Sequence, residues 1–194
     1  MINYTLIINS ALLGIGLAMD AFSVSLANGL SENKMSSGRM LGIAGTFAFF
    51  QFAMPIIGWF CVHNIAERFE KFQEYIPWIA FALLLYIGGK MLIEGIRNLK
   101  KGTDVADMVK AVGLAELMIQ GIATSIDALS VGFTIANYDA LTAMISALII
   151  GVVTLIICLA GLSIGKTFGT KLAGKASILG GIILVIIAIK IIRF

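Results

Sequence analysis

Residues 14–24 read GIGLAMDAFSV, and 107 positions later residues 121–131 read GIATSIDALSV. The two stretches share the frame G-I-x-x-x-x-D-A-x-S-V, and Gly58 and Gly165 recur at the same offset. Apolar helices can resemble one another by chance, but an Asp-Ala-x-Ser core inside two apolar segments is unusual. The stretch therefore predicts a chain built from two related halves.

The composition around these stretches is typical of a membrane protein. Of the 194 residues, 59% are hydrophobic and 13% are charged, and the mean hydropathy is +1.00. Soluble domains carry about 25% charged residues, so this chain has too few to cover a surface in water. The net charge of +3 is too small to indicate a nucleic-acid partner. We expect an all-α integral membrane protein that lies in a lipid bilayer.

Six apolar segments approach or exceed the roughly 20 residues that a helix needs to cross a bilayer. We expect transmembrane helices at Tyr4–Asn28, Met40–His63, Ile76–Asn98, Val109–Ala136, Ala140–Gly165 and Ala176–Phe194. Polar connections are expected at residues 29–39, 64–75, 99–108, 137–139 and 166–175. The first half then comprises residues 1–98 and the second half residues 109–194, and a cytoplasmic loop at 99–108 joins them.

Each half has three helices, an odd number, so the second half enters the membrane in the opposite direction to the first. An inverted 3+3 repeat of this kind is a transporter architecture, with the substrate site near mid-membrane where the repeats meet. Asp20 and Asp127 are then expected at symmetric depths, about 10 Å apart along the membrane normal at a rise of 1.5 Å per residue.

Lysine and arginine are distributed unevenly between the connections on the two sides. One side carries nine: Lys34, Arg39, Arg97, Lys100, Lys101, Lys110, Lys166, Lys171 and Lys175. The other side carries four: Arg68, Lys71, Lys190 and Arg193. Because basic residues concentrate in cytoplasmic loops, we expect both termini to face outward from a bacterial plasma (inner) membrane.

The two intramembrane aspartates are the first candidates for a binding site. A charged Asp in the bilayer interior costs about 3 kcal/mol on insertion scales and marks a function by default. Neither Asp20 nor Asp127 has a basic neighbour along the chain, so a bound cation is the natural compensation. Protonated acids that hydrogen-bond across a helix interface are the alternative.

A third source of oxygen is expected near the middle of the second span. Pro55 has no N–H, so the backbone carbonyl of residue 51 loses its helical partner. Residue 51 is Gln51, which would offer that carbonyl and a side-chain amide. A plain kink at Pro55 remains the alternative.

The candidate metal ligands are therefore Asp20, Asp127 and Gln51, and Met19 could add one sulfur or simply pack. Carboxylate, amide and carbonyl oxygens suit Mg, Ca or Mn, and a sulfur ligand would favour Mn. Four hydroxyl residues could support the site or pack the helices: Ser23, Ser130, Thr124 and Ser125.

Three more charged residues lie close to the expected helix ends. Lys90 and Glu94 are four residues apart and can form an ion pair on one helix face. Glu116 lies in the first third of the fourth span. Its carboxylate could line an access route from the cytoplasm, or it could simply reach the interface.

Four motifs, in order along almost the whole chain, give a family resemblance. They are DAFSVS at residues 20–25, FQFAMPIIGW at 50–59, GGKMLIEG at 88–95 and ATSIDALSVG at 123–132. With them the chain resembles the bacterial manganese efflux pumps of the MntP family. The resemblance implies export of Mn²⁺ by a small secondary transporter, and Asp20 and Asp127 match the family's aspartates. Position 51 varies between Gln and Glu in the family, so Gln51 gives this site two carboxylates rather than three.

No G-x-x-x-x-G-K-[ST] loop is present, so nothing indicates an ATPase or another enzyme. Export of a dication against an inside-negative potential must be coupled to another gradient. We expect proton antiport, in which the two aspartates exchange Mn²⁺ for protons, with sodium as an alternative counter-ion. Mn²⁺ is then the substrate, and no cofactor is expected.

Other functions remain possible at this point. The same plan would suit an exporter of other divalent cations, or of small organic cations or amino acids. An intramembrane aspartyl hydrolase also needs two aspartates, but these must share one proton at hydrogen-bond distance. A structural or sensor protein that transports nothing is the last alternative.

Overall fold

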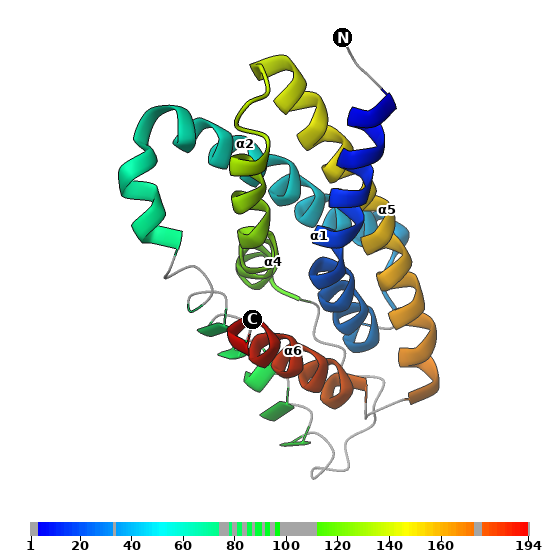
Figure 1. Cartoon of the computed structure of the whole chain (residues 1–194). Helices are drawn as coiled ribbons and strands as arrows, with labels where there is room; N and C mark the ends of the chain where they lie inside the picture. Colours follow the sequence, from blue (N-terminus) through cyan, green and yellow to red (C-terminus); the bar gives the residue numbers. More distant parts are fainter. Residues whose placement is uncertain are drawn as a thin grey trace.

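The computed structural model describes residues 4–32, 34–73, 78, 81–82, 85–86, 88–90, 92–93, 96–97, 112–172 and 176–193. Its named helices are α1 (Tyr4–Ser31), α2 (Ser37–Gln73), α4 (Leu114–Thr134), α5 (Ala140–Leu172) and α6 (Ala176–Arg193). The described positions between 78 and 97 are helical as well. Every regular element in the described part of the chain is a helix, which confirms the all-α class (Figure 1).

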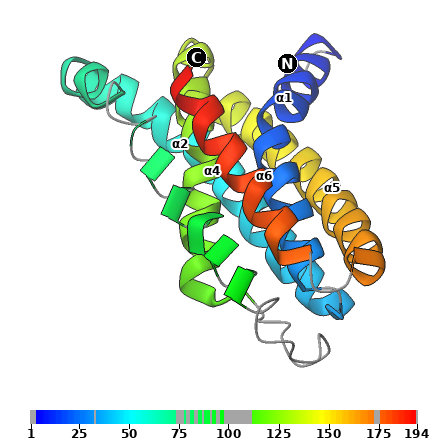
Figure 2. The same ribbon diagram turned by 90° about the horizontal axis from the view of Figure 1, so that it is seen from below.

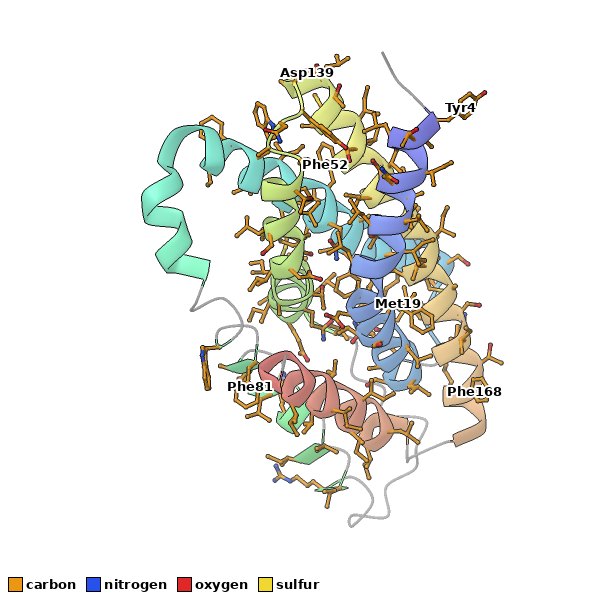
Figure 3. The ribbon with its side chains drawn as sticks, viewed as in Figure 1. Tyr4, Met19, Phe52, Phe81, Asp139 and Phe168 are labelled. Atoms are coloured by element: carbon orange, nitrogen blue, oxygen red, sulfur yellow. The ribbon has the colours of Figure 1, made fainter. Side chains whose placement is uncertain are left out.

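Four of these helices are long and apolar enough to cross a membrane. The qualifying segments are Tyr4–Ser31, Ser37–Cys61, Leu114–Gly132 and Ala140–Phe168. They coincide with the first, second, fourth and fifth expected spans. Most of the third expected span lies outside the described residues, and α6 occupies the sixth without being one of the four. Large apolar side chains such as those of Tyr4, Met19 and Phe168 are exposed on the outer surface (Figure 3), where lipid would cover them.

Several helix boundaries differ from the expected ones. α1 continues to Ser31, α2 begins at Ser37 and α5 continues to Leu172, so the connections expected at residues 29–39 and 166–175 are partly helical. A polar connection was expected at residues 64–75, but α2 continues to Gln73. This stretch contains no glycine or proline before Pro77 and is rich in helix-forming Ala, Glu, Lys and Gln. α4 begins at Leu114 instead of Val109, because the preceding Gly113 is not helical and glycine costs a helix interior about 1 kcal/mol relative to Ala.

Asp139 marks the start of α5 as its N-cap residue. Its backbone carbonyl accepts the N–H of Ala143 at 2.9 Å, and its carboxylate accepts the hydroxyl of Thr142 at 2.5 Å. The hydrogen bond from Thr142 holds the pKa of Asp139 below its ordinary value. A charged carboxylate at this position also suits the positive end of the helix dipole.

The helices pair between the two halves of the chain. α1 lies along α5, and α2 lies along α4 (Figures 1 and 2). The hydroxyls of Ser10 and Ser146 are hydrogen-bonded at 2.7 Å, and Gly29 meets Gly165 further along. Both contacts join residues that are 136 positions apart, so α1 and α5 run parallel.

Glycines bring both pairs of helices into backbone contact. Gly29 meets Gly165 between α1 and α5, and Gly58 meets Gly132 between α2 and α4. A Cβ atom at Gly58 would overlap the carbonyl oxygen of Leu129. Small residues at such crossings are how helices pack closely in lipid, where the hydrophobic effect does not drive them together.

We expect Gly58→Ala to destabilise the protein, because the added methyl group must push α4 away from α2, at roughly 1–3 kcal/mol for an overpacked site. Gly42→Ala is the matched control on the same helix, since a Cβ there meets no atom within 4 Å and alanine is the better helix former. Thermal unfolding of the detergent-solubilised protein should give a lower Tm for Gly58→Ala only. Equal Tm values for the two variants would contradict the close crossing.

Candidate metal site

The register between α1 and α4 decides which of their side chains meet. Near one end, the amides of Asn28 and Gln120 are hydrogen-bonded to each other. Near the other end, Leu13 and Ile135 line the same pocket. In both pairs the residue numbers add up to 148. The two helices therefore run antiparallel, and residues with this sum lie at the same level.

This register brings Asp20 and Asp127 to nearly the same level, since their numbers add up to 147. They are close enough for their negative charges to interact. The separation of about 10 Å expected from the helix rise assumed that both helices are centred in the membrane. That assumption fails because the Asn28–Gln120 contact sets the register, and in this register the midpoints of α1 and α4 lie at different levels.

The two carboxylates are accessible to different degrees. Asp20 is half-buried, whereas Asp127 is exposed. One oxygen of Asp127, Oδ1, accepts the N–H of Ala128 at 2.8 Å. Ionisable side chains at membrane depth face the bundle interior or a water-filled cavity, which makes these two carboxylates candidates for a site that an ion can reach.

Gln51 of α2 reaches both aspartate helices and is fully buried. Its Nε2 donates to the carbonyl of Leu17 at 3.1 Å and to the carbonyl of Thr124 at 3.2 Å. These acceptors are equivalent positions of the repeat, 107 residues apart, and each lies three residues before an aspartate. The amide therefore lies where the two repeated stretches meet.

The second polar atom of this amide is unsatisfied. Among the described residues, the buried Oε1 of Gln51 has no hydrogen-bond partner. A buried acceptor without a partner costs about 1–3 kcal/mol, and such groups in native proteins call for an explanation. An oxygen kept free at the level of two carboxylates is suited to a metal ligand.

The structure places Pro55 and Met19 without deciding their roles. Pro55 is buried one turn after Gln51, and α2 is continuous across it. The carbonyl of residue 51 as a ligand therefore stays a prediction. Met19 is 49% exposed, and Figure 3 labels it on α1. A role of its sulfur as a ligand therefore stays a prediction.

Three of the four candidate hydroxyls donate within their own helices. They are Ser23, which bonds to the carbonyl of Met19, Thr124, which bonds to Gln120, and Ser125, which bonds to Gly121. Ser130 is exposed. The first three can offer a ligand only their oxygen lone pairs, so helix packing is their visible role.

Lys90 forms an ion pair with Glu116 at 3.1 Å, which joins the third expected span to the first turn of α4. Glu94, the partner expected for Lys90, lies outside the described residues. Glu116 is half-buried and begins a polar row on one face of α4 that continues through Gln120 and Thr124 to Asp127, at helical spacings of four, four and three.

A polar pair that we did not predict joins this row to α1. Asn28 and Gln120 are both fully buried. They exchange two hydrogen bonds, from Nδ2 of Asn28 to Oε1 of Gln120 at 2.7 Å and from Nε2 of Gln120 to Oδ1 of Asn28 at 3.3 Å. The helical spacing from Gln120 to Asp127 was a visible signal for one partner.

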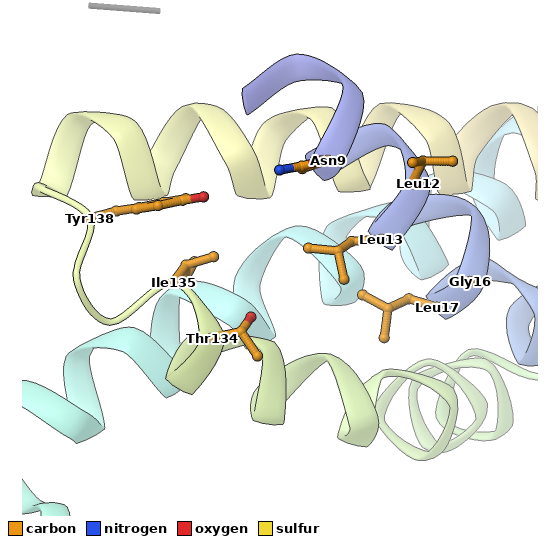
Figure 4. A pocket seen from close by; sticks show the side chains of 8 residues that line it. All are labelled: Asn9, Leu12, Leu13, Gly16, Leu17, Thr134, Ile135 and Tyr138. Atoms are coloured by element: carbon orange, nitrogen blue, oxygen red, sulfur yellow. The ribbon is translucent and has the colours of Figure 1, made fainter. Parts of the chain in front are cut away.

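A pocket of about 600 Å³ lies at the opposite end of the α1–α4 pair. Figure 4 shows Leu13 and Leu17 of α1 pointing toward Thr134 and Ile135 of α4. The remaining lining residues are Asn9, Leu12, Gly16 and Tyr138. Since the carbonyl of Leu17 is an acceptor of Gln51, the pocket extends to within one turn of Asp20.

The arrangement offers mostly oxygen atoms to a ligand. No group of three or more His, Cys, Asp or Glu side chains occurs among the described residues. A cation between Asp20 and Asp127 would therefore have to complete its coordination with the amide oxygen of Gln51, backbone carbonyls or water. Oxygen ligands of this kind suit hard divalent cations.

Comparison with known proteins points to one family. Residues 34–192 match the family model described as "Putative manganese efflux pump". A protein of Methanobrevibacter smithii named "Putative manganese efflux pump MntP" is 38% identical over 187 residues, 96% of this chain and 97% of that protein. A namesake from Ruminiclostridium cellulolyticum is 41% identical over 187 residues, 93% of this chain and 92% of that protein. No solved structure matches the chain.

We expect Gln51→Leu to leave the stability unchanged or to raise it. The substitution removes a buried oxygen without a partner, and the carbonyls that the amide contacts lie inside helices and keep their backbone bonds. Gln120→Leu is the control, because it leaves the buried amide of Asn28 unpaired at about 1–3 kcal/mol. Thermal unfolding in detergent should separate the two variants. An equal loss of Tm in both variants would show that the hydrogen bonds of Gln51 stabilise the packing of the helices.

Proposed function

The chain belongs to the family of manganese efflux pumps whose model it matches, and on this premise we propose that it is a membrane transporter that exports Mn²⁺ from the cytoplasm. The apolar helices make it a multi-pass membrane protein. The names of its relatives favour Mn²⁺ over the organic cations and amino acids that the sequence left open.

One observation supports the location of the transport site. Gln51 holds a buried oxygen free between the helices of Asp20 and Asp127, and the two carboxylates lie at nearly the same level. We infer that these three residues bind Mn²⁺ in transit, together with water and the carbonyl of residue 51. A site with two carboxylates neutralises the dication, which a site deep in the bilayer requires.

We further propose the inverted 3+3 repeat. In this repeat, α4 is the counterpart of α1, and α2 is the counterpart of α5. The contact of α1 with α5 therefore corresponds to the contact of α4 with α2, and these are the two most extensive helix contacts. The parallel direction of α1 and α5 and the glycine crossing in each pair support the same relation. The binding site then lies on the pseudo-two-fold axis, as in other inverted-repeat transporters.

The end of the helices that carries most basic residues is taken as the cytoplasmic, or inner, end. Arg39 donates to the carbonyl of Val112, and Lys166 donates to the carbonyl of Met35. The start of α4 and the α1–α2 connection therefore lie at this basic end, which the positive-inside rule assigns to the cytoplasm. Both termini then face outward from the plasma (inner) membrane.

Proton antiport is the coupling that this site supports best. Two like charges at one level repel each other, and either a dication or protons relieve the repulsion. Binding of Mn²⁺ and binding of protons then exclude one another, which is the requirement for exchange. An inward proton gradient would release Mn²⁺ on the outer side.

Asp20→Asn and Asp127→Asn should each reduce Mn²⁺ transport by roughly a hundredfold, since each removes one of the two negative charges that offset the dication in the membrane. The measurement is Mn²⁺ flux in proteoliposomes with and without a pH gradient, and wild-type flux should increase with the gradient. Asp139→Asn is the control, because this carboxylate caps α5 outside the spans. Full transport by either intramembrane variant would exclude the shared site.

The role of Pro55 can be tested by metal binding to the purified protein. Pro55→Ala restores an N–H that re-pairs the carbonyl of residue 51, so affinity for Mn²⁺ should fall although no side-chain ligand is changed. Gln51→Glu should bind more tightly and release more slowly than wild type, and Gln51→Leu should bind more weakly. Wild-type affinity in Pro55→Ala would mean that the proline only shapes the helix.

A further inference from the structure

The two ends of the α1–α4 pair are in different states. At the inner end, Asn28 and Gln120 satisfy each other's amides and exclude water between the helices. At the outer end, residues of both helices line the pocket of about 600 Å³. Six water molecules around a cation need roughly 180 Å³ at about 30 Å³ each, so a hydrated dication fits in this pocket.

Further contacts close the inner end. Nε of Arg39 lies 2.6 Å from the carboxylate of Glu32, and its NH2 donates to the carbonyl of Val112 at 2.6 Å. These bonds connect the end of α1, the start of α2 and the segment before α4. Lys166 of α5 donates to the carbonyl of Met35 at 2.6 Å. The whole inner end is therefore tied by charge-assisted hydrogen bonds, which are stronger than neutral ones.

The repeat relates the closed end to the open one. Shifted by 107 positions, Asn28 corresponds to Ile135, and Gln120 corresponds to Leu13. Leu13 and Ile135 are the two residues that face each other across the pocket (Figure 4). The same two positions of the repeat thus form a hydrogen-bonded pair at the inner end and line a pocket at the outer end.

We propose that Asn28 and Gln120 form the inner gate of the cation path, and that Leu13 and Ile135 form its outer gate. This inference rests on the proposed transport function, and it adds that the structure shows the path closed inside and open outside. In the opposite state, Leu13 and Ile135 meet and the two amides separate. Asp20 and Asp127 lie seven or eight residues from either gate, about 10–12 Å at the helical rise.

The exchange between these states trades a polar contact for an apolar one. When the inner gate opens, the amides of Asn28 and Gln120 bind water instead of each other, which costs little in a wet vestibule. At the same time, Leu13, which is now exposed, buries its side chain against Ile135, which is already buried. Neither state then leaves an unpaired buried polar group at a gate, so small differences in ligand binding can shift the population.

The test weakens the contacts that close the inner end and measures how accessible each end is to a labelling reagent. In a background without Cys61 and Cys158, Leu13→Cys reports from the pocket, and Leu117→Cys reports from a buried position one turn before Gln120. A membrane-impermeant maleimide is added from outside or from inside in oriented vesicles.

Arg39→Gln removes the bonds to Glu32 and Val112. It should shift the equilibrium between the inner-closed and inner-open states roughly tenfold, as loss of one charge-assisted bond does. Labelling at Leu13→Cys should fall while labelling at Leu117→Cys rises.

Lys34→Gln is the matched control, since it removes the same charge from an exposed position in the same connection and should change neither rate. If Arg39→Gln does not accumulate in membranes, Glu32→Gln weakens the same ion pair from its other side. If Arg39→Gln leaves labelling at Leu13→Cys unchanged, or raises labelling at both reporters, the proposed gates are wrong. Mn²⁺ flux of the same proteins separates the two proposals: a wild type that labels reciprocally but moves no Mn²⁺ refutes the function alone.

Discussion

A negative charge at membrane depth must face something other than lipid, and in this chain that condition falls on two aspartates at nearly one level. It requires α1 and α4 to face each other, so each needs another helix to cover its remaining sides. α5 supplies this cover for α1, and α2 supplies it for α4. The position of Gln51 follows, because α2 can then place one amide against both aspartate helices.

Much of the fold could be predicted from the sequence, because lipid exposure produces long apolar runs that are easy to see. The continuation of α2 to Gln73 could not, since hydropathy reports where lipid lies and not where a helix ends. The site is a similar case. The repeated Asp-Ala-x-Ser core made Asp20 and Asp127 candidates, and Pro55 drew attention to Gln51; their binding of a metal stays a proposal. Met19 is next to Asp20 in the chain but one residue turns a helix by about 100°, and its side chain is on the surface.

The pair of Asn28 and Gln120 shows what sequence reasoning lacks. Their contact joins residues that are 92 positions apart, and it depends on the register of α1 against α4. Helical periodicity fixes which residues share a face of one helix, but not which level of the next helix they meet. The two kinds of interface also differ physically. Backbone contacts at glycines hold α1 to α5 and α2 to α4, whereas α1 meets α4 through side-chain hydrogen bonds that water can replace.

The pairing of α1 with α5 has a consequence for how the chain is made. A ribosome releases α1 into the membrane long before α5, because contacting residues such as Ser10 and Ser146 are 136 positions apart. During that interval the glycine surface of α1 and its aspartate have no native cover. Contacts between distant parts of a chain form late and slowly, so the first helix must wait at the translocon or beside transient partners. Among the described helices, the most extensive contacts of α1 and of α2 are with helices of the second half, so they form only when synthesis of that half is well advanced.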